Sequence, residues 1–242
     1  MRTAAALVIG NEILSGKTQD ANTFALAKWL RKMGIKLSRT VSILDDVETI
    51  ASEVRSLSAT HDYLFTSGGV GPTHDDVTME GVAAAFGVKV VSDPGLETMI
   101  TNHYGERLRE GHLRMAIVPE GSKQIASAEV WWPVTVMNNV FVLPGVPEIF
   151  RLKLTVVEQL VQADVPFLSR AVFTKMDEGT LKPLLDAIVE AYPDVDVGSY
   201  PSWTAPDYKT KLTFDGRDAA QLEAAVQRFV ATLPAGEPQR VE

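Results

Sequence analysis

The sequence predicts an α/β fold in which a mostly parallel sheet carries helices on both faces, followed by a small second α/β domain. Three observations predict it. Apolar runs of strand length alternate with amphipathic runs of helix length over most of the chain. Glycine and proline residues stand between many of these runs, where loops are expected. The chain has 242 residues, 45% of them apolar, enough to bury one large core or two modest ones.

The elements of the first domain are expected in an alternating order. Asp20 is suited to cap a helix that Gly34 ends, and Asp93-Pro94 is suited to begin another that reaches Tyr104. We expect strands over 4–9, 35–44, 63–66, 88–91 and 140–143, and helices over 20–33, 47–57, 78–86, 93–104 and 148–162. Short extended pieces are expected between 115 and 143.

A domain boundary is expected near the segment 163–166. This divides the chain into a domain over 1–165 and a small C-terminal domain over 166–242 with the order strand, helix, strand, strand, helix. Its strands are expected over 167–174, 195–200 and 208–214, and its helices over 179–192 and 219–233, the last with an apolar face.

Charge and cysteine content exclude several classes of function. The chain has 31 acidic and 23 basic residues and a net charge of −8, which disfavours binding to nucleic acids and to anionic membranes. It has no cysteine, which excludes disulfides, thiolate nucleophiles and cysteine-ligated metals. The apolar run 4–9 is too short for a signal peptide, and no stretch approaches the roughly 20 apolar residues that span a bilayer. A cytoplasmic protein is expected.

The segment 66–78 carries the strongest functional signal. Adjacent and nearby glycines between a strand and a helix allow backbone N–H groups to surround a phosphate, and the following helix N-terminus adds donors. No lysine follows the glycines as in a P-loop, and their spacing differs from a dinucleotide-binding turn. The candidate phosphate-binding residues here are Gly68, Gly69, Val70, Gly71, Thr73 and Thr78.

Acidic residues stand beside this segment. Asp75 and Asp76 would repel a phosphate unless a hard divalent cation lay between them and the ligand. In the alternative, one acid caps the helix and the other is solvated. His74 could donate to a phosphate or transfer a proton, or lie exposed at a loop tip.

Three further loops follow predicted strands and would lie at the same edge of a parallel sheet. They are expected to gather Glu12, Asp45, Asp76 and Glu148 around one crevice. Alternatively, Asp45 and Asp46 cap a helix and Glu148 complements a helix dipole. Further candidate ligand-binding residues in these loops are Gly10, Asn22, Pro144 and Gly145.

Other polar and aromatic residues are weaker candidates. The remaining histidines, His61, His103 and His112, lack metal-ligand spacing. Trp131-Trp132 could stack on a base, although packing is favoured. In the second domain, Ser199 and Tyr200 with nearby lysines could reach a phosphate or adenosine, or form a plain tight turn.

The chain resembles the molybdopterin-binding-domain superfamily, and within it the N-terminal part of CinA-type competence/damage-inducible proteins and the corresponding domain of animal FAD synthases. The resemblance extends over nearly the whole chain and depends on four ordered motifs. These are Gly10–Gly16 with Asp20 and Asn22, Ser67–Thr78, Leu143–Glu148, and Gly198–Pro201.

The resemblance implies a three-layer domain of the molybdopterin-binding type and homo-oligomers, either dimers or trimers. In molybdopterin-handling relatives, the acids matching Asp76 and Asp45 are associated with Mg²⁺ and adenylyl transfer. In the CinA and FAD-synthase branch, which the Asp75-Asp76 pair matches better, the associated activity is metal-dependent cleavage of a nucleotide pyrophosphate. No deamidase or FAD synthase domain follows residue 242, so those two activities are not expected.

The sequence and the resemblance together predict a divalent-metal-dependent hydrolase of nucleotide diphosphates such as ADP-ribose or FAD. Mg²⁺, Mn²⁺ or Co²⁺ on Asp76, with Asp45 or Asp75, would bridge the diphosphate that the glycine turn holds, and an activated water would attack phosphorus. Glu12 or His74 would orient that water. The alternatives are molybdopterin binding or adenylyl transfer in molybdenum cofactor biosynthesis, and a non-catalytic nucleotide-binding module.

Overall fold

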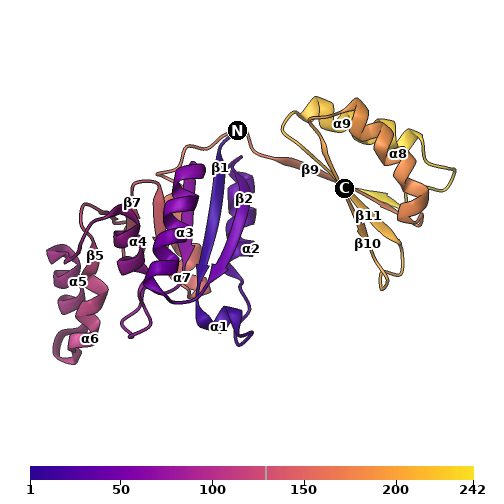
Figure 1. Ribbon diagram of the computed structural model, residues 1–242. Coiled ribbons are helices and arrows are strands. Elements are labelled where there is room, and N and C mark those ends of the chain that lie inside the picture. Colours follow the sequence, from indigo (N-terminus) through magenta and orange to yellow (C-terminus); the bar gives the residue numbers. More distant parts are fainter. Residues whose placement is uncertain (129) are drawn as a thin grey trace. The chain divides into compact units, whose positions relative to one another are not determined.

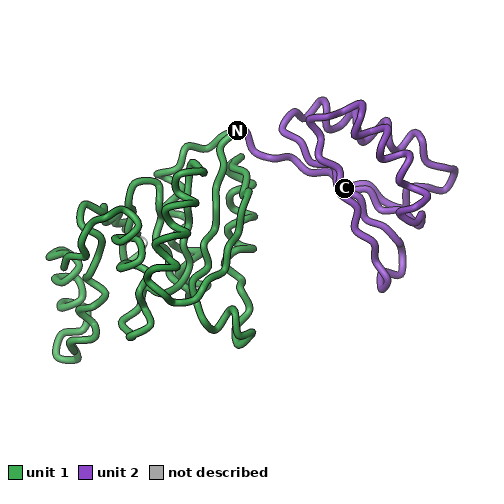
Figure 2. The backbone as a smooth tube through the Cα atoms, in the orientation of Figure 1, with its two compact units in different colours: residues 1–164 green, residues 165–242 purple. Residues whose placement is uncertain are grey.

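The computed structural model describes residues 1–128 and 130–242, which form two compact units. Unit 1 comprises residues 1–164 and unit 2 residues 165–242 (Figure 2). None of the helices in the described ranges is long and apolar enough to cross a membrane.

Unit 1 is built on a sheet whose described strands lie in the order β2-β1-β3-β8-β7-β6. The first four in this order are parallel to their neighbours, whereas β7 and β6 are antiparallel additions at one edge. The bounds are β1 Thr3–Ile9, β2 Lys36–Ile43, β3 Tyr63–Ser67, β6 Lys123–Ile125, β7 Val134–Met137 and β8 Val140–Leu143.

Helices cover both faces of this sheet, as Figure 1 shows. On one face, Ala4 and Ala6 of β1 pack in a core with α2 and α7; on the other, Ala5 and Leu7 pack in a core with α3 and α4. Alternate side chains of one strand enter opposite cores because a strand directs successive residues to opposite faces. The predicted three-layer, mostly parallel α/β fold is confirmed. The helices are α2 Asn22–Lys32, α3 Val47–Thr60, α4 Thr78–Phe86 and α7 Pro147–Val157.

The helices differ from expectation in several details: α7 ends at Val157 and not at 162, and two further differences lie near the loop that follows β1. A short helix, α1 (Asn11–Leu14), occupies the first loop, where none was predicted. Helix α2 begins later than expected, with Ala21 at its N-cap, and Asp20 Oδ1 accepts from the N–H groups of Asn22 and Thr23 at 2.9 and 3.0 Å. Asp20 thus stabilises the helix start from one position further upstream.

A small subdomain extends from unit 1 between α4 and β6. Leu96 and Ile100 of α5 pack there against Ala116 and Val118, with Trp132 beside them. Its elements are β4 Val90–Ser92, α5 Pro94–Tyr104, η1 Gly105–Arg107, α6 Glu110–Leu113, η2 Arg114–Ala116 and β5 Ile117–Pro119.

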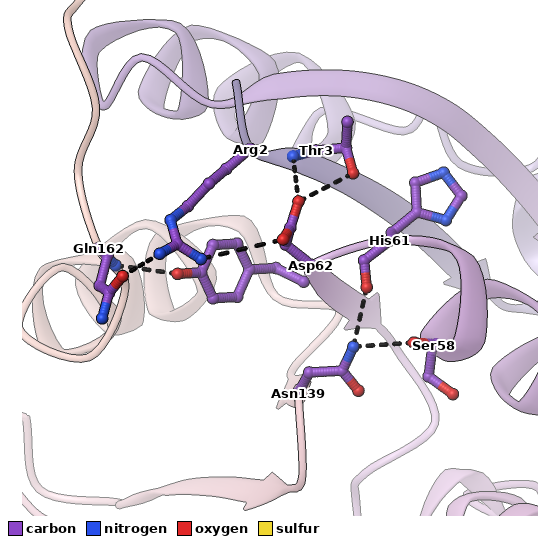
Figure 3. A network of polar contacts seen from close by, with 8 residues as sticks. Arg2, Thr3, Ser58, His61, Asp62, Asn139 and Gln162 are labelled. Carbon is purple, nitrogen blue, oxygen red and sulfur yellow. Dashed lines mark hydrogen bonds and ion pairs between the residues drawn. The ribbon is translucent and has the colours of Figure 1, made fainter.

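A polar network joins the strands of unit 1 at the sheet edge where the parallel strands begin (Figure 3). Asp62, just before β3, accepts from Thr3 N at 2.7 Å. Asn139, just before β8, donates to the Ser58 and His61 carbonyls at 2.9 and 3.0 Å. The Thr3 N–H group lowers the pKa of Asp62. These contacts join neighbouring strands at the edge opposite to the loops that follow them.

Unit 2 has an antiparallel sheet with the order β10-β11-β9-β12. Helices α8 and α9 pack against it around a core that includes Phe214 and Phe229. Its elements are β9 Leu168–Thr174, α8 Glu178–Ala191, β10 Asp196–Pro201, β11 Thr210–Gly216, α9 Ala219–Ala231 and β12 Arg240–Val241. The short β12, which pairs with β9, was not predicted.

Candidate functional site

Four loops meet at the edge of the unit 1 sheet where the parallel strands end. Gly10, after β1, donates to the Ile43 carbonyl of β2 at 3.1 Å, and Gly68, after β3, donates to the Leu143 carbonyl of β8 at 3.2 Å. The Asn11 N–H group donates to Asp45 Oδ2 at 2.8 Å. The loops predicted to share one edge therefore do share it, because the strands before them are parallel.

Asn22 is the central polar side chain of this edge. It is 4% exposed, and its Nδ2 donates to Ser67 Oγ at 2.9 Å and to the Gly145 carbonyl at 2.8 Å. It thereby joins the start of α2 to the end of β3 and to the loop after β8. Its Nδ2 is used within the protein, which gives this candidate ligand-binding residue a positioning role, whereas its buried Oδ1 has no hydrogen-bond partner among the described residues.

The glycine-rich turn has a conformation and a packing that require its glycines. Gly68 and Gly69 have φ of +106° and +63°, and a Cβ on Gly68 would lie 2.0 Å from the Ile9 carbonyl oxygen. Thr78, fully buried at the start of α4, donates its hydroxyl to the Gly68 carbonyl at 2.9 Å and its N–H group to the Gly69 carbonyl at 3.0 Å. Thr78 therefore holds the turn in place through two hydrogen bonds, and its role as a ligand contact stays a prediction.

The N–H groups of the turn are available to a ligand. In the described part of the chain, the backbone N–H groups of Gly69, Val70 and Gly71 have no hydrogen-bond acceptor. All three residues line a pocket. Consecutive unpaired N–H groups beside residues of positive φ make an anion-binding concavity.

This pocket extends from the turn to the small subdomain and to α7. Asp76 provides a carboxylate, and Trp132 provides an aromatic ring. Its lining residues are Gly69, Val70, Gly71, Asp76, Met79, Glu80, Arg114, Met115, Ile117, Trp132, Pro133, Thr135, Val142 and Lys153. Trp132 therefore combines the packing role favoured from the sequence with a position on the pocket wall.

Thr73 holds both acids of the turn. Asp76 Oδ2 accepts from the Thr73 N–H group at 2.8 Å and from its hydroxyl. Asp75 Oδ1 lies 2.6 Å from the same hydroxyl. This hydrogen bond is the main reason that the pKa of Asp75 is lowered. The side chain of His74 is 95% exposed, and its Nδ1 lies 3.8 Å from Asp75. Asp76 is half-buried on the pocket wall, whereas Asp75 and His74 lie in solvent.

The expected convergence of acids is corrected by the structure. Among the described residues, no group of three or more histidines, aspartates and glutamates lies close enough to hold a metal ion. Asp45 accepts a hydrogen bond from the Asn11 N–H group, the Glu12 carboxylate lies against Gly10, and Glu148 is exposed at the start of α7. Asp76 is the one of the four that lines the described pocket.

The pocket also contains charged residues that the sequence analysis did not select. These are Glu80, Arg114 and Lys153. Arg114 and Glu80 form an ion pair at 3.8 Å. Lys153 could have been found, since it occupies the apolar stripe of α7 that also contains Phe150, Leu154 and Val157. The sequence around Arg114 contains no pattern that distinguishes it from a surface arginine.

Of the candidate residues in unit 2, Ser199 and Lys211 have partners within that unit. Ser199 Oγ donates to Glu178 Oε1 at 2.7 Å, and Tyr200 is 56% exposed. The Lys211 ammonium lies 5.7 Å from the centre of the Phe173 ring. A ligand-binding role for Ser199 and Tyr200 stays a prediction.

Comparison with known proteins assigns the family. Residues 5–166 match the family described as probable molybdopterin binding domain. The chain belongs to the molybdopterin-binding-domain family. Residues 166–242 of this family member match a second family, the FAD synthase middle domain.

Relatives of this molybdopterin-binding-domain protein cover most of its length. A protein of Archaeoglobus fulgidus is 34% identical over 93% of this chain and 95% of its own length. A probable FAD synthase of Caenorhabditis elegans is 33% identical over 93% of this chain but only 49% of its own, so the chain spans about half of that relative. Among solved structures, a CinA protein of unknown function from Thermoplasma acidophilum matches with a TM-score of 0.60 and 31% identity, covering 65% of this chain and 96% of the other.

Proposed function

We propose that this protein is a divalent-metal-dependent hydrolase of nucleotide diphosphates, with ADP-ribose and FAD as model substrates. The observation that carries the proposal is that one half-buried carboxylate, Asp76, lines the same pocket as three N–H groups that have no acceptor among the described residues. The N–H groups suit the oxygens of a phosphate, and the carboxylate suits a cation bound to that phosphate.

The residues of the chain have distinct roles in this proposal. Gly69, Val70 and Gly71 bind phosphate oxygens and stabilise the charge that develops on them as the phosphorus is attacked. Thr73 orients Asp76 through its N–H group and hydroxyl. Trp132 provides an apolar surface beside the phosphate site, suited to a flat ring of the substrate.

The pocket fits a divalent cation of the kind that works with phosphates. Such cations commonly take one or two carboxylates and complete their coordination with water and substrate oxygens, so no all-protein cluster is required. Asp76 would hold the cation, with Asp75 next to it in the chain as the nearer further candidate and Asp45, on the loop after β2, as the more distant one. When bound, the cation neutralises phosphate charge and makes the phosphorus more electrophilic.

A second candidate function is supported by the family match. The probable molybdopterin binding domain assigned to residues 5–166 favours a pterin phosphate as ligand, with binding or adenylyl transfer as the activity. The same N–H groups would hold the pterin phosphate. The two candidates therefore differ in whether the protein acts on a nucleotide diphosphate or on a pterin phosphate.

A substrate and metal screen tests the proposal. The purified protein is incubated with ADP-ribose or FAD and with Mg²⁺, Mn²⁺ or Co²⁺, and AMP is measured by chromatography. We expect AMP with at least one metal and a loss of about hundredfold or more in Asp76→Asn, because the carboxylate acts on charge in the transition state. Asp186→Asn, an exposed acid of unit 2, is the matched control and should retain activity.

Two outcomes would overturn the hydrolase. The first is absence of AMP with every metal, and the second is full activity of Asp76→Asn. Molybdopterin binding with ATP-dependent product, in a protein that makes no AMP from either ADP-ribose or FAD, would support the second candidate. Tight ADP-ribose or FAD binding that is unchanged in Asp76→Asn and never followed by turnover would support a non-catalytic module.

A further inference from the structure

Lys153 has an unusual environment for a lysine. It lies on the apolar stripe of α7 and is 4% exposed, although lysine is almost never buried without a partner of opposite charge. Its Nζ donates to the Pro133 carbonyl at 2.7 Å, which uses one of its three N–H groups.

The charge of Lys153 has no counter-charge among the residues that the structure describes. In the two described ranges, no carboxylate lies within ion-pair distance of its Nζ. A buried ammonium without a counter-charge destabilises the fold, and the burial lowers the pKa of Lys153 to about 8. The side chain therefore remains mostly protonated at neutral pH and lacks an anion.

The position of Lys153 indicates where that anion comes from. Lys153 and Pro133 line the same pocket as Asp76 and the unpaired N–H groups of the glycine turn. Strand β7 runs antiparallel to β8, with Thr135 opposite Val142, so its first residues lie at the edge where β8 ends. The other charged residues of the pocket wall are Asp76, Glu80 and Arg114, and the last two pair with each other.

We propose that Lys153 binds a phosphate group of the pocket's ligand, as a second anion-binding group beside the glycine turn. The inference deepens the proposed function and rests on it for the class of ligand. The turn holds one phosphate through N–H groups and the ammonium holds the other, so the site selects a ligand with two linked phosphates over one with a single phosphate. The ligand supplies the counter-charge that Lys153 does not find among the described residues.

Binding measurements without turnover test this inference. Inorganic pyrophosphate and inorganic phosphate are titrated by calorimetry into the full chain in the presence of a chelator. We expect pyrophosphate to bind more tightly than phosphate, and Lys153→Met to weaken pyrophosphate binding about tenfold or more, because a charged hydrogen bond is lost. Lys182→Met, an exposed lysine of unit 2, changes net charge equally and should bind as the unmodified protein does.

A pH series on the unmodified protein gives an independent readout that needs no variant to fold. ADP-ribose keeps a constant diphosphate charge above neutral pH. Its affinity should fall as the pH rises from 7 to 9.5 through the pKa of Lys153 near 8, since the ammonium loses its proton. In Lys153→Met this loss of affinity should disappear, whereas Asp76, Glu80 and Arg114 are unchanged in that variant.

The results separate this inference from the hydrolase proposal. Pyrophosphate binding that is equal in Lys153→Met and the unmodified protein, or an ADP-ribose affinity that is constant from pH 7 to 9.5, would overturn the role of Lys153. Lysine-dependent binding without AMP production would overturn the hydrolase and leave the inference standing. AMP production with unchanged kinetic constants in Lys153→Met would support the hydrolase and overturn the role of Lys153.

Discussion

At the residue scale, the glycine turn depends on contacts that only a residue without a side chain permits. Gly68 lies with its Cα so close to the Ile9 carbonyl that any Cβ overlaps it, and its φ is positive. Gly145 approaches the same place from the loop after β8, where an added Cβ would lie 3.4 Å from the Gly68 Cα. Two loops and the end of β1 therefore pack through backbone atoms, which brings the N–H groups of the turn into one place.

Gly68→Ala should destabilise the protein far more than a glycine-to-alanine change at a position with the same sign of φ and free space. Gly16 is that control, since its φ is +73° and nothing lies within 4 Å of an added Cβ. We expect a cost of about 1–2 kcal/mol for Gly16→Ala from backbone strain alone. For Gly68→Ala we expect about 3 kcal/mol or more, because the overlap with the Ile9 carbonyl adds to the strain. Urea unfolding measures both, and equal costs would contradict the packing argument.

At the element scale, the site depends on side chains that join segments distant in sequence. Asn22 donates to two partners that come from β3 and from the loop after β8, and it does so from the first residue of α2. Thr78 joins α4 to the glycine turn in the same way. These buried polar contacts set the position of each loop relative to its neighbours, which hydrophobic packing alone does not specify.

Asn22→Ala should lower the free energy of unfolding by about 2 kcal/mol, because it removes the donor to the buried Ser67 hydroxyl and to the Gly145 carbonyl. The variant should also bind phosphate and pyrophosphate more weakly, because the loops after β3 and β8 lose the side chain that joins them. The control is Asn102→Ala on the exposed side of α5, which should stay within about 0.5 kcal/mol of the unmodified protein. Weakened binding in Asn22→Ala at unchanged stability would instead indicate that Asn22 contacts the ligand directly.

At the scale of the whole molecule, each unit has its own hydrophobic core. The cores of the three-layer unit consist of residues before 165, and the core around Phe214 and Phe229 consists of residues after it. The pocket is lined entirely by residues of unit 1 in the described chain. The net charge of the whole molecule does not predict the charge inside the pocket: a net charge of −8 coexists with a buried ammonium that has no carboxylate partner among the described residues.

A fragment of residues 1–164 should therefore fold by itself and retain pyrophosphate binding. We expect a cooperative thermal transition by circular dichroism and an affinity within a few-fold of the full chain, since the cores and the pocket are complete without unit 2. A folded fragment that has lost its affinity would show that unit 2 contributes to the ligand site. Ser199 and Tyr200 would then be the first residues to substitute.

The sequence by itself determined the layered fold, the glycine turn and the four loops at one sheet edge. Each of these follows from local pattern: the spacing of apolar residues, the stop and cap residues of helices, and the rule that parallel strands end at a common edge. Asp76 was identified in the same way, since it lies within the motif.

Only the tertiary structure decided which side chains meet. Asp45, Glu12 and Glu148 were expected beside Asp76, but none of the three lines the described pocket, because a shared edge does not determine where each carboxylate points. Lys153 lines the pocket from α7, although it is far from the glycine turn in the sequence. Its role depends on burial and on the absence of a counter-charge among the described residues, and these are properties of three-dimensional packing that no local pattern contains.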